Sequence, residues 1–176
     1  PIILDPVGAG ATALRTNAAK RILAETRVSL VRGNASEILA LAGAQSNTRG
    51  VDAVDSVDQA ADQAIRMARE LGIPVAITGP QDLITDGSRV VRVSNGHSLM
   101  GAVTGTGCGA TAVIAAFCGV DRDPVTAAST ALACYGLAGE RAAIDSKGPG
   151  TFVPRFLDNL YNLTPAELER DARISE

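Results

Sequence analysis

The chain has 176 residues, of which 46% are hydrophobic and 20% are charged, and its formal net charge is −3. This length and composition predict one globular domain with a sizeable hydrophobic core. The small negative charge without a basic run argues against a nucleic-acid partner and an anionic membrane surface, and no apolar stretch has the length of a membrane span.

The cysteines indicate the cellular compartment of the protein, and the first residues indicate whether an N-terminal segment is missing. Cys108, Cys118 and Cys134 lack metal-type spacing and no signal peptide precedes them, which favours reduced thiols in the cytoplasm. The chain opens on Pro-Ile-Ile-Leu-Asp, the body of a strand with no initiator Met before it. We therefore expect residues 1–176 to be a single domain that lacks its N-terminal segment.

Short apolar runs alternate with helical patterns along the chain. The runs favour strands at residues 1–4, 28–31 and 75–78, and a hairpin with strands at residues 83–87 and 89–94 that bracket Asp86-Gly87. Spacing and end signals predict helices over residues 12–25, 35–42, 57–71, 110–119, 124–143, 151–162 and from 165 onward, with candidate capping boxes at 34–37, 56–59 and 164–167. Residues 45–50 read as a polar loop.

This alternation predicts an α/β fold, a mostly parallel sheet with helices on both faces. Open sheets of this kind bind ligands at the carboxyl ends of their strands. Asp5 and Thr78 each follow or end a predicted strand and therefore belong to that edge. An Asp that only holds the following turn, or a Thr that only forms one, explains the same residues equally well.

The strongest candidate for a binding site is the segment of residues 102–112, AVTGTGCGATA. It lies just before an apolar helical run. Gly105, Gly107 and Gly109 carry no Cβ, so the backbone can turn tightly and bring its N–H groups near a ligand. A glycine-rich turn that opens a helix binds phosphate or a developing oxyanion. Cys108 lies within it and could act as thiolate, base or neutral hydrogen-bond partner. A plain tight turn with a small hydrophobic cysteine is the alternative.

Three further polar segments allow both a structural and a functional interpretation. Asn34 and Glu37 can form a capping box, while Arg32 and Glu37 at a strand-to-helix turn also suit phosphate and magnesium. His97 and Lys147 lie in polar, glycine-containing loops, where a solvated side chain and a contact to a ligand are both open.

Four segments in this order resemble the hydroxyethylthiazole kinase family of the ribokinase-like superfamily: DPVGAGAT at residues 5–12, RGNASE at 32–37, ITGP at 77–80 and VTGTGC at 103–108. The resemblance extends over nearly the whole chain. It implies a ribokinase-like α/β fold and the MgATP-dependent phosphorylation of the primary alcohol of 4-methyl-5-(2-hydroxyethyl)thiazole in thiamine biosynthesis and salvage.

The resemblance also assigns roles by position. It implies that Arg32 and Thr78 bind ATP, and that Asp5 and Glu37 are the acidic positions near magnesium and the phosphates. Gly105 is implied to contact the thiazole, and residues 105–109, with Gly107 at the centre, to form the anion hole. Cys108 stands where most ribokinase relatives place an aspartate base. Family members are homotrimers with active sites between subunits, and an upstream segment carries part of their thiazole pocket.

Other functions remain open beside this one. A kinase for a related hydroxymethyl-pyrimidine or pyridoxal-like alcohol would share the same phosphate machinery. An ATP-dependent NAD(P)H-hydrate dehydratase uses this fold with an aspartate in the glycine turn, and Cys108 in that place weighs against it. A non-catalytic nucleotide-binding protein is a further alternative.

Overall fold

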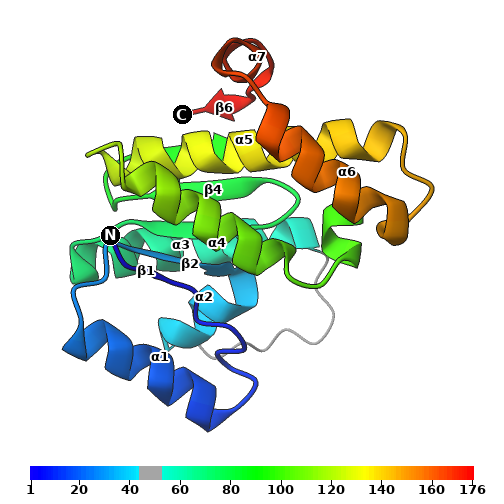
Figure 1. Ribbon diagram of the computed structural model, residues 1–176. Coiled ribbons are helices and arrows are strands. Elements are labelled where there is room, and N and C mark those ends of the chain that lie inside the picture. Colours follow the sequence, from blue (N-terminus) through cyan, green and yellow to red (C-terminus); the bar gives the residue numbers. More distant parts are fainter. Residues whose placement is uncertain (44–52) are drawn as a thin grey trace.

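The computed structural model describes the backbone of residues 1–43 and 53–176, and the side chains of all of these except 53–59. Within this part a six-stranded sheet is covered by helices on both faces (Figure 1). The strands are β1 (Ile3–Leu4), β2 (Leu30–Asn34), β3 (Val75–Thr78), β4 (Asp82–Thr85), β5 (Val90–Val93) and β6 (Ile174–Ser175). The helices are α1 (Ala13–Glu25), α2 (Ala35–Leu41), α3 (Ala53–Leu71), the 3-10 helix η1 (Ser98–Ala102), α4 (Thr106–Cys118), α5 (Pro124–Ile144), α6 (Pro149–Asn162) and α7 (Pro165–Asp171).

The sheet follows the order of the chain, β1-β2-β3-β4-β5-β6, and is mixed. β1, β2 and β3 are parallel, while β4, β5 and β6 each run antiparallel to the strand before them. The expectation of a mostly parallel sheet therefore holds for β1 to β3 only, because the hairpin and the returning β6 reverse the chain direction. The register pairs Asn34 with Thr78, which brings the carboxyl ends of β2 and β3 to the same edge.

Each face of the sheet has its own hydrophobic core. On one face, side chains of β2 to β5 pack against α4, α5 and α6, with Ile114, Leu132 and Phe152 among the buried residues. On the other face, the sheet packs against α1, α2 and α3 through residues such as Ile38 and Ala64. Figure 1 shows the two helical layers on opposite sides of the strands. The core is built mainly from aliphatic side chains, as the low aromatic content of 3% requires.

Helix ends agree closely with the signals in the sequence. Thr12 and Asp123 cap α1 and α5 through their side chains, and capping boxes open α2 and α7 as predicted. The predicted box at residues 56–59 is wrong, because α3 already begins at Ala53. The predicted loop at residues 45–50 lies outside the described residues. η1 and β6 have no counterpart in the prediction, since both are short and depend on contacts with distant segments.

Glycines on α5 let a loop pack directly on its backbone. A Cβ at Gly136 would lie 2.4 Å from the carbonyl oxygen of Asn95, and a Cβ at Gly139 would lie 2.4 Å from Sδ of Met100. Such distances are far inside van der Waals contact. A side chain at Gly136 would meet backbone atoms, so only glycine fits there, whereas one at Gly139 would require the Met100 side chain to move. The segment between β5 and η1 is thereby held close to the middle of α5.

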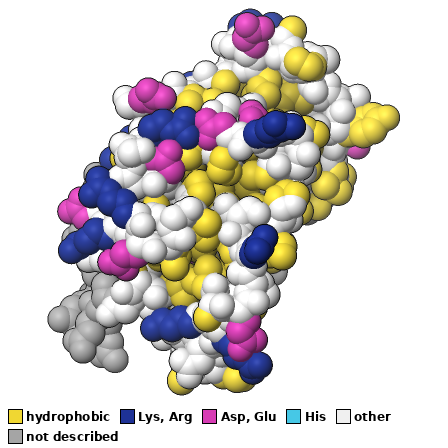
Figure 2. Space-filling model, turned by 90° about the vertical axis from the view of Figure 1, so that its left-hand side faces the viewer, with side chains coloured by type: hydrophobic (Ala, Val, Ile, Leu, Met, Phe, Trp, Pro, Cys, Tyr) yellow, Lys and Arg dark blue, Asp and Glu magenta, His cyan; other side chains and the backbone are white. Residues whose placement is uncertain are grey.

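The molecular surface carries both charged and apolar regions. Figure 2 shows hydrophobic side chains gathered in a band across one face, bordered by Lys, Arg, Asp and Glu. Large hydrophobic side chains with high exposure include Leu14, Val120 and Tyr161. In the described part of the chain, no helix combines the length and the apolar character needed to cross a bilayer.

Adding a methyl group at Gly136 tests the close packing on α5. We expect Gly136→Ala to lower the free energy of unfolding by about 1–3 kcal/mol, because the new Cβ meets backbone atoms that cannot rotate away. Gly150→Ala in α6 is the matched control, since its Cβ would have no neighbour within 4 Å. Urea unfolding of both variants measures the difference, and equal stabilities would contradict the packing described here.

Candidate active site

The guanidinium of Arg32 lies where the ends of three parallel strands meet. Its Nη1 donates to Oδ2 of Asp5, directly after β1, at 3.2 Å, and its Nη2 donates to Oγ1 of Thr78, the last residue of β3. Thr111 on α4 also donates to Oδ2 of Asp5, at 2.8 Å. The side chains of Arg32 and Asp5 are 11% and 13% exposed, so this ion pair is largely shielded from water. The structure thus brings three of the predicted site residues together.

Arg32 also retains an unused donor. Its Nε is buried and has no hydrogen-bond partner, and among the described residues it is the one buried side-chain nitrogen or oxygen in this condition. An arginine presents several N–H groups in a fixed planar fork, which suits the oxygens of a phosphate. Asp5 and Thr78 therefore position the side chain of Arg32 without using all of its N–H donors.

The predicted glycine turn packs against this guanidinium. α4 begins at Thr106, inside the glycines, and Gly105 caps it with a left-handed φ of +97°. A Cβ at Gly107 would lie 3.0 Å from Nη1 of Arg32, so the absent side chain allows the helix start to approach the cation. The first N–H groups of a helix carry the positive end of its dipole. Together with Arg32 they form a site for an anion.

Tyr135 on α5 packs against the glycine turn and hydrogen-bonds to its backbone. Its hydroxyl donates to the carbonyl oxygen of Thr106 at 2.9 Å, and a Cβ at Gly109 would lie 2.3 Å from that hydroxyl oxygen. Burial raises the pKa of Tyr135 to about 12, so the hydroxyl stays protonated and keeps donating. Gly109 therefore serves close packing, while Gly105 and Gly107 shape the turn itself.

The three cysteines differ in their surroundings. Cys108 lies in the first turn of α4 and is exposed to solvent, but it does not line the cavity that Arg32, Thr78 and Gly107 share. Cys118 and Cys134 are partly buried, and burial raises the pKa of both thiols. Cys118 packs against the hydrophobic core on the side of the sheet that α4, α5 and α6 cover.

Glu37 holds the loop after β1 in place. Its Oε2 accepts the N–H of Asn34 at 2.9 Å, closing the capping box, and its Oε1 accepts the N–H of Gly8, also at 2.9 Å. The carboxylate therefore joins the start of α2 to the glycine-rich loop of residues 6–10. The capping interpretation is confirmed for Asn34 and Glu37.

The acidic residues offer a partial set of ligands for magnesium. Arg32 and Thr111 both donate to Oδ2 of Asp5, which leaves its Oδ1 for another ligand. No three His, Cys, Asp or Glu residues of the described part cluster in a way that could hold a metal ion. Mg²⁺ is commonly held by one or two carboxylates with water and substrate phosphate completing its octahedron. Among the described residues, Asp5 keeps one carboxylate oxygen for such an ion, whereas both oxygens of Glu37 already accept backbone N–H groups.

A cavity of about 540 Å³ extends from this cluster. Arg32, Thr78 and Gly107 contribute to its lining, and so do Asn95, Gly96 and His97, which follow β5. Cavities of a few hundred Å³ are typical of small-molecule sites. His97 accepts the N–H of Leu99 through Nδ1 at 3.2 Å and so caps η1. Lys147 is exposed and is not part of this lining.

Asp82 also lines the cavity, although no motif in the sequence marks it. It begins β4, is 8% exposed, and accepts the N–H of Gly79 at 3.0 Å. Burial raises its pKa to about 7, against the opposing effects of the Gly79 hydrogen bond and the charge of Arg32. The signal available in the sequence was a single acidic residue at the start of an apolar strand, after ITGPQ.

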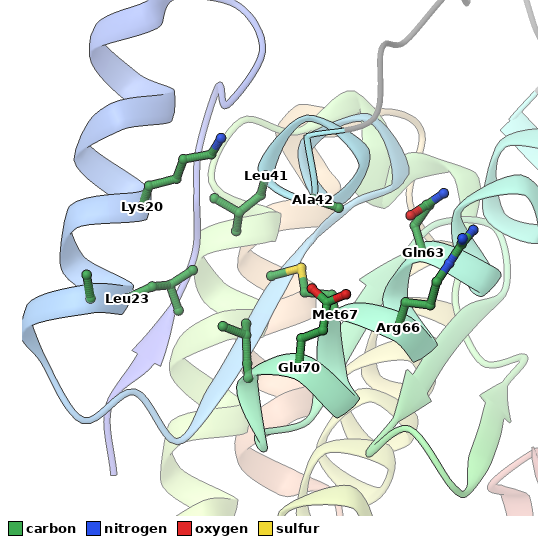
Figure 3. Close-up of a pocket in the computed structure, with 10 residues that line it drawn as sticks. Lys20, Leu23, Leu41, Ala42, Gln63, Arg66, Met67 and Glu70 are labelled. Carbon is green, nitrogen blue, oxygen red and sulfur yellow. The ribbon is translucent and has the colours of Figure 1, made fainter.

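A second cleft, of about 480 Å³, lies between α1, α2 and α3 (Figure 3). Leu23, Leu41 and Met67 form its apolar part, with Lys20 and Glu70 among its charged residues. None of the predicted site residues lines it. The chemistry expected of the glycine turn therefore belongs to the cavity beside Arg32.

Comparisons with known proteins agree on one family. The model of the hydroxyethylthiazole kinase family matches residues 1–166. The chain is 62% identical over 176 residues to the hydroxyethylthiazole kinase of Desulfotalea psychrophila, covering 100% of this chain and 64% of that protein. It is 52% identical to the hydroxyethylthiazole kinase of Desulfosudis oleivorans, covering 100% of this chain and 65% of that protein. The chain thus spans just under two thirds of the length of these relatives.

A solved structure of the same family has the same fold. The hydroxyethylthiazole kinase protein from Pyrococcus horikoshii OT3 superposes with a TM-score of 0.88 at 38% sequence identity, covering 99% of this chain and 65% of that one. The likeness confirms the predicted ribokinase-like α/β fold. It extends over nearly the whole chain, including the strands that carry Asp5, Arg32 and Thr78.

The raised pKa of Asp82 makes a prediction about stability and pH. The folded state holds this proton more tightly than the unfolded state, whose pKa is near 3.8. The associated stability is fully present below pH 4 and is lost as the pH rises through 7, at no more than about 1.4 kcal/mol per pH unit. Asp82→Asn cannot ionise and should escape this loss. Urea unfolding should show the variant gaining on the unsubstituted protein between pH 5 and pH 8, and a constant difference would contradict the assignment.

Proposed function

Because the chain belongs to the hydroxyethylthiazole kinase family, we propose that the protein uses ATP to phosphorylate the primary alcohol of 4-methyl-5-(2-hydroxyethyl)thiazole, a step of thiamine biosynthesis and salvage. The observation that carries this proposal is the meeting of Arg32, Thr78 and the start of α4 at one end of a cavity of small-molecule size. A cation, a hydroxyl and a helix N-terminus together suit the phosphates of a nucleotide.

Arg32 and Thr78 are proposed to bind the ATP phosphates. Asp5 and Thr78 hold the guanidinium in one orientation before ATP arrives, so little side-chain freedom remains to be lost on binding. The N–H groups around Gly105 and Gly107 point along the same helix dipole and form the anion hole for the transferred group.

Asp5 and Glu37 are proposed to hold Mg²⁺ together with the phosphates. When bound, the ion neutralises charge that develops on the phosphoryl oxygens. Asp5 contributes through Oδ1, the oxygen that its protein partners leave free in the described part of the chain. Glu37 contributes from the first turn of α2, where its Oε1 also accepts the N–H of Gly8.

Cys108 is proposed to orient the alcohol, and Gly105 to contact the thiazole. Phosphoryl transfer passes through a loose transition state in most analyses, so positioning and charge neutralisation dominate and proton removal from the alcohol can come late. A weak base is then sufficient. The exposed thiol in the first turn of α4 can accept a hydrogen bond from the substrate hydroxyl at Sγ while the adjacent N–H groups face the phosphoryl group.

The domain organisation, the cellular location and the oligomeric state of the protein are also proposals. Residues 1–176 are taken as a single domain, and its three cysteines, which are free thiols, support a cytoplasmic location. A homotrimer is supported by the band of hydrophobic side chains on the face seen in Figure 2, because apolar bands of this kind often cover an interface. Sedimentation velocity measures the assembly directly, and a monomer at working concentration would exclude the trimer.

ADP production tests the proposed activity. The full-length natural protein is supplied with MgATP and either the thiazole alcohol, a hydroxymethyl-pyrimidine or no acceptor. We expect turnover that depends on the thiazole alcohol and disappears when Mg²⁺ is chelated. Turnover with the pyrimidine instead would reassign the acceptor. ATP binding without turnover on either alcohol would contradict the kinase and favour a dehydratase or a non-catalytic nucleotide-binding protein.

The same assay separates the contribution of Cys108. We expect Cys108→Ala to lower kcat while the KM for ATP stays unchanged, because the thiol faces the acceptor rather than the nucleotide. An unchanged kcat would remove Cys108 from the mechanism and leave the helix N-terminus and Arg32 to act alone.

A further inference from the structure

One part of the cavity wall is a short segment between β5 and η1. We call residues 94–97 the wall segment, of which Asn95, Gly96 and His97 line the cavity. Asn95 is 5% exposed, and the α5 backbone at Gly136 packs directly against its carbonyl group. The wall segment is thus fixed on the side that faces α5. Hydrogen bonds from other parts of the chain hold the wall segment on its remaining sides.

The other attachments come from the C-terminal residues, far away in the sequence. The N–H of Ser94 donates to the carbonyl oxygen of Arg173 at 2.9 Å, and the N–H of Arg173 donates to Oδ1 of Asn95 at 2.7 Å. Nη2 of Arg173 donates to the carbonyl oxygen of Ser94 at 2.8 Å. Nδ2 of Asn95 donates to the carbonyl oxygen of Asp171 at 3.2 Å. Backbone and side chain of the wall segment are therefore both bound by residues 171–173.

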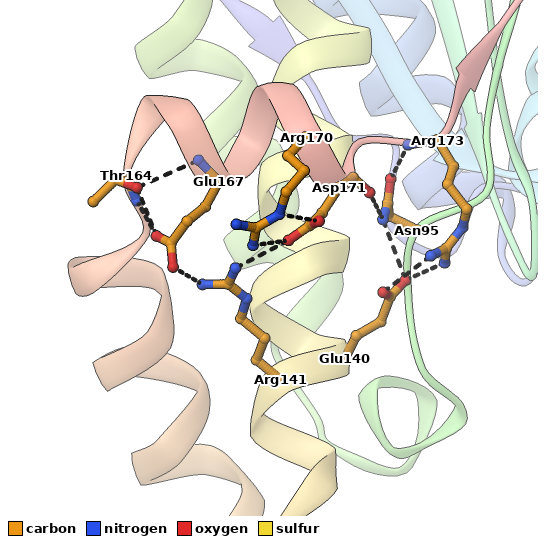
Figure 4. A network of polar contacts seen from close by, with 8 residues as sticks. All are labelled: Asn95, Glu140, Arg141, Thr164, Glu167, Arg170, Asp171 and Arg173. Atoms are coloured by element: carbon orange, nitrogen blue, oxygen red, sulfur yellow. Dashed lines mark hydrogen bonds and ion pairs between the residues drawn. The ribbon is translucent and has the colours of Figure 1, made fainter.

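Glu140 on α5 completes the attachment. Its Oε1 accepts the N–H of Gly96 at 2.7 Å and also pairs with the guanidinium of Arg173. Its Oε2 accepts from Nη1 of Arg173 at 3.2 Å. Figure 4 shows Glu140 reaching toward both Arg173 and Asn95 from the helix below. One carboxylate thus joins the wall segment, the C-terminal residues and α5.

The C-terminal residues are themselves anchored independently of the wall segment. Arg141, next to Glu140 on α5, pairs with Glu167 at 2.8 Å and with Asp171 at 3.2 Å (Figure 4). α7 is therefore bound to α5 by one set of ion pairs and presents Arg173 through another. Loss of the Arg173 side chain would leave α7 and the backbone bonds of the wall segment in place, and would remove the guanidinium's bonds to Ser94 and Glu140.

We propose that Arg173, acting with Glu140, is a positioning residue that holds the wall segment in the conformation that binds the nucleotide. The inference rests on the proposed function, in which Arg32 and Thr78 bind the phosphates at one end of the cavity. The remainder of ATP then lies along the lining to which Asn95 and Gly96 belong. Arg173 does not line the cavity and lies beyond residues 1–166, the part of the chain that the family model matches.

The expected effect is on affinity for ATP. If the wall segment, loosened by the loss of the guanidinium, spends only about one tenth of its time in the binding conformation, the apparent Kd rises about tenfold, because affinity falls with the populated fraction. Chemistry at the glycine turn is untouched by this change. KM for ATP should therefore rise in Arg173→Ala, while kcat at saturating ATP and KM for the thiazole alcohol stay unchanged.

Isothermal titration with ATP compares Arg173→Ala with Arg170→Ala as a matched control. Arg170 lies in the same C-terminal region, but its guanidinium pairs only with Asp171 among the described residues and is 68% exposed. We expect the Kd for ATP to rise about tenfold in Arg173→Ala and to change less than about twofold in Arg170→Ala. Arg173→Lys, which can still pair with Glu140, should recover part of the affinity.

The outcomes separate this inference from the proposed function. A mere loss of folded protein would lower the binding stoichiometry and leave the Kd unchanged, which would count against a positioning role. Equal Kd values for the Arg173 and Arg170 variants would overturn the inference while leaving ATP binding intact. If Arg173→Ala does not fold, Glu140→Gln decides in the same way, since it keeps an acceptor for Gly96 and loses the ion pair. An unsubstituted protein that binds no ATP would remove the proposed function first.

Discussion

The contact between Arg32 and Asp5 is the constraint on which the rest of the site depends. Arg32 lies in a strand whose neighbours, Val31 and Gly33, are buried, so its charge needs a partner close by. Asp5 supplies the opposite charge from β1 and Thr78 supplies an acceptor from β3. A guanidinium with its planar fork can satisfy both at once. The three parallel strands are thus joined at their carboxyl ends by a group that also lines the cavity.

The remaining features of the site follow from this fixed cation. Gly107 must lack a side chain because α4 begins against the guanidinium, and Thr111 on the same helix donates to Asp5. The positive end of α4 therefore lies next to Arg32 and strengthens the attraction for an anion. Asp82 lines the same cavity, and burial favours its neutral form. The cavity is consequently biased toward a ligand that carries negative charge.

Local signals allowed much of this structure to be predicted from the sequence. The capping boxes at Asn34 and Thr164, the hairpin at Asp86-Gly87 and the glycine turn before α4 each depend on residues a few positions apart. The assignment of Arg32 and Thr78 to one site needed the family resemblance as well. Strand direction after β3 was only partly predictable, since the hairpin alone indicated a reversal of the chain.

The features that were missed depend on contacts between distant segments. Asp82 is buried only because β4 lies inside the sheet, and the link between Arg173 and the wall segment joins residues 78 or more positions apart. No spacing in the sequence marks either of them.

The central claim, that Arg32 is held ready to bind ATP by its fork of donors, is tested most directly by the Kd for ATP of Arg32→Lys, with the exposed Arg155→Lys as control. We expect the affinity of Arg32→Lys for ATP to fall about tenfold or more with the fold retained, because a lysine cannot bond Asp5 and Thr78 in the same geometry. An unchanged Kd in Arg32→Lys would contradict it.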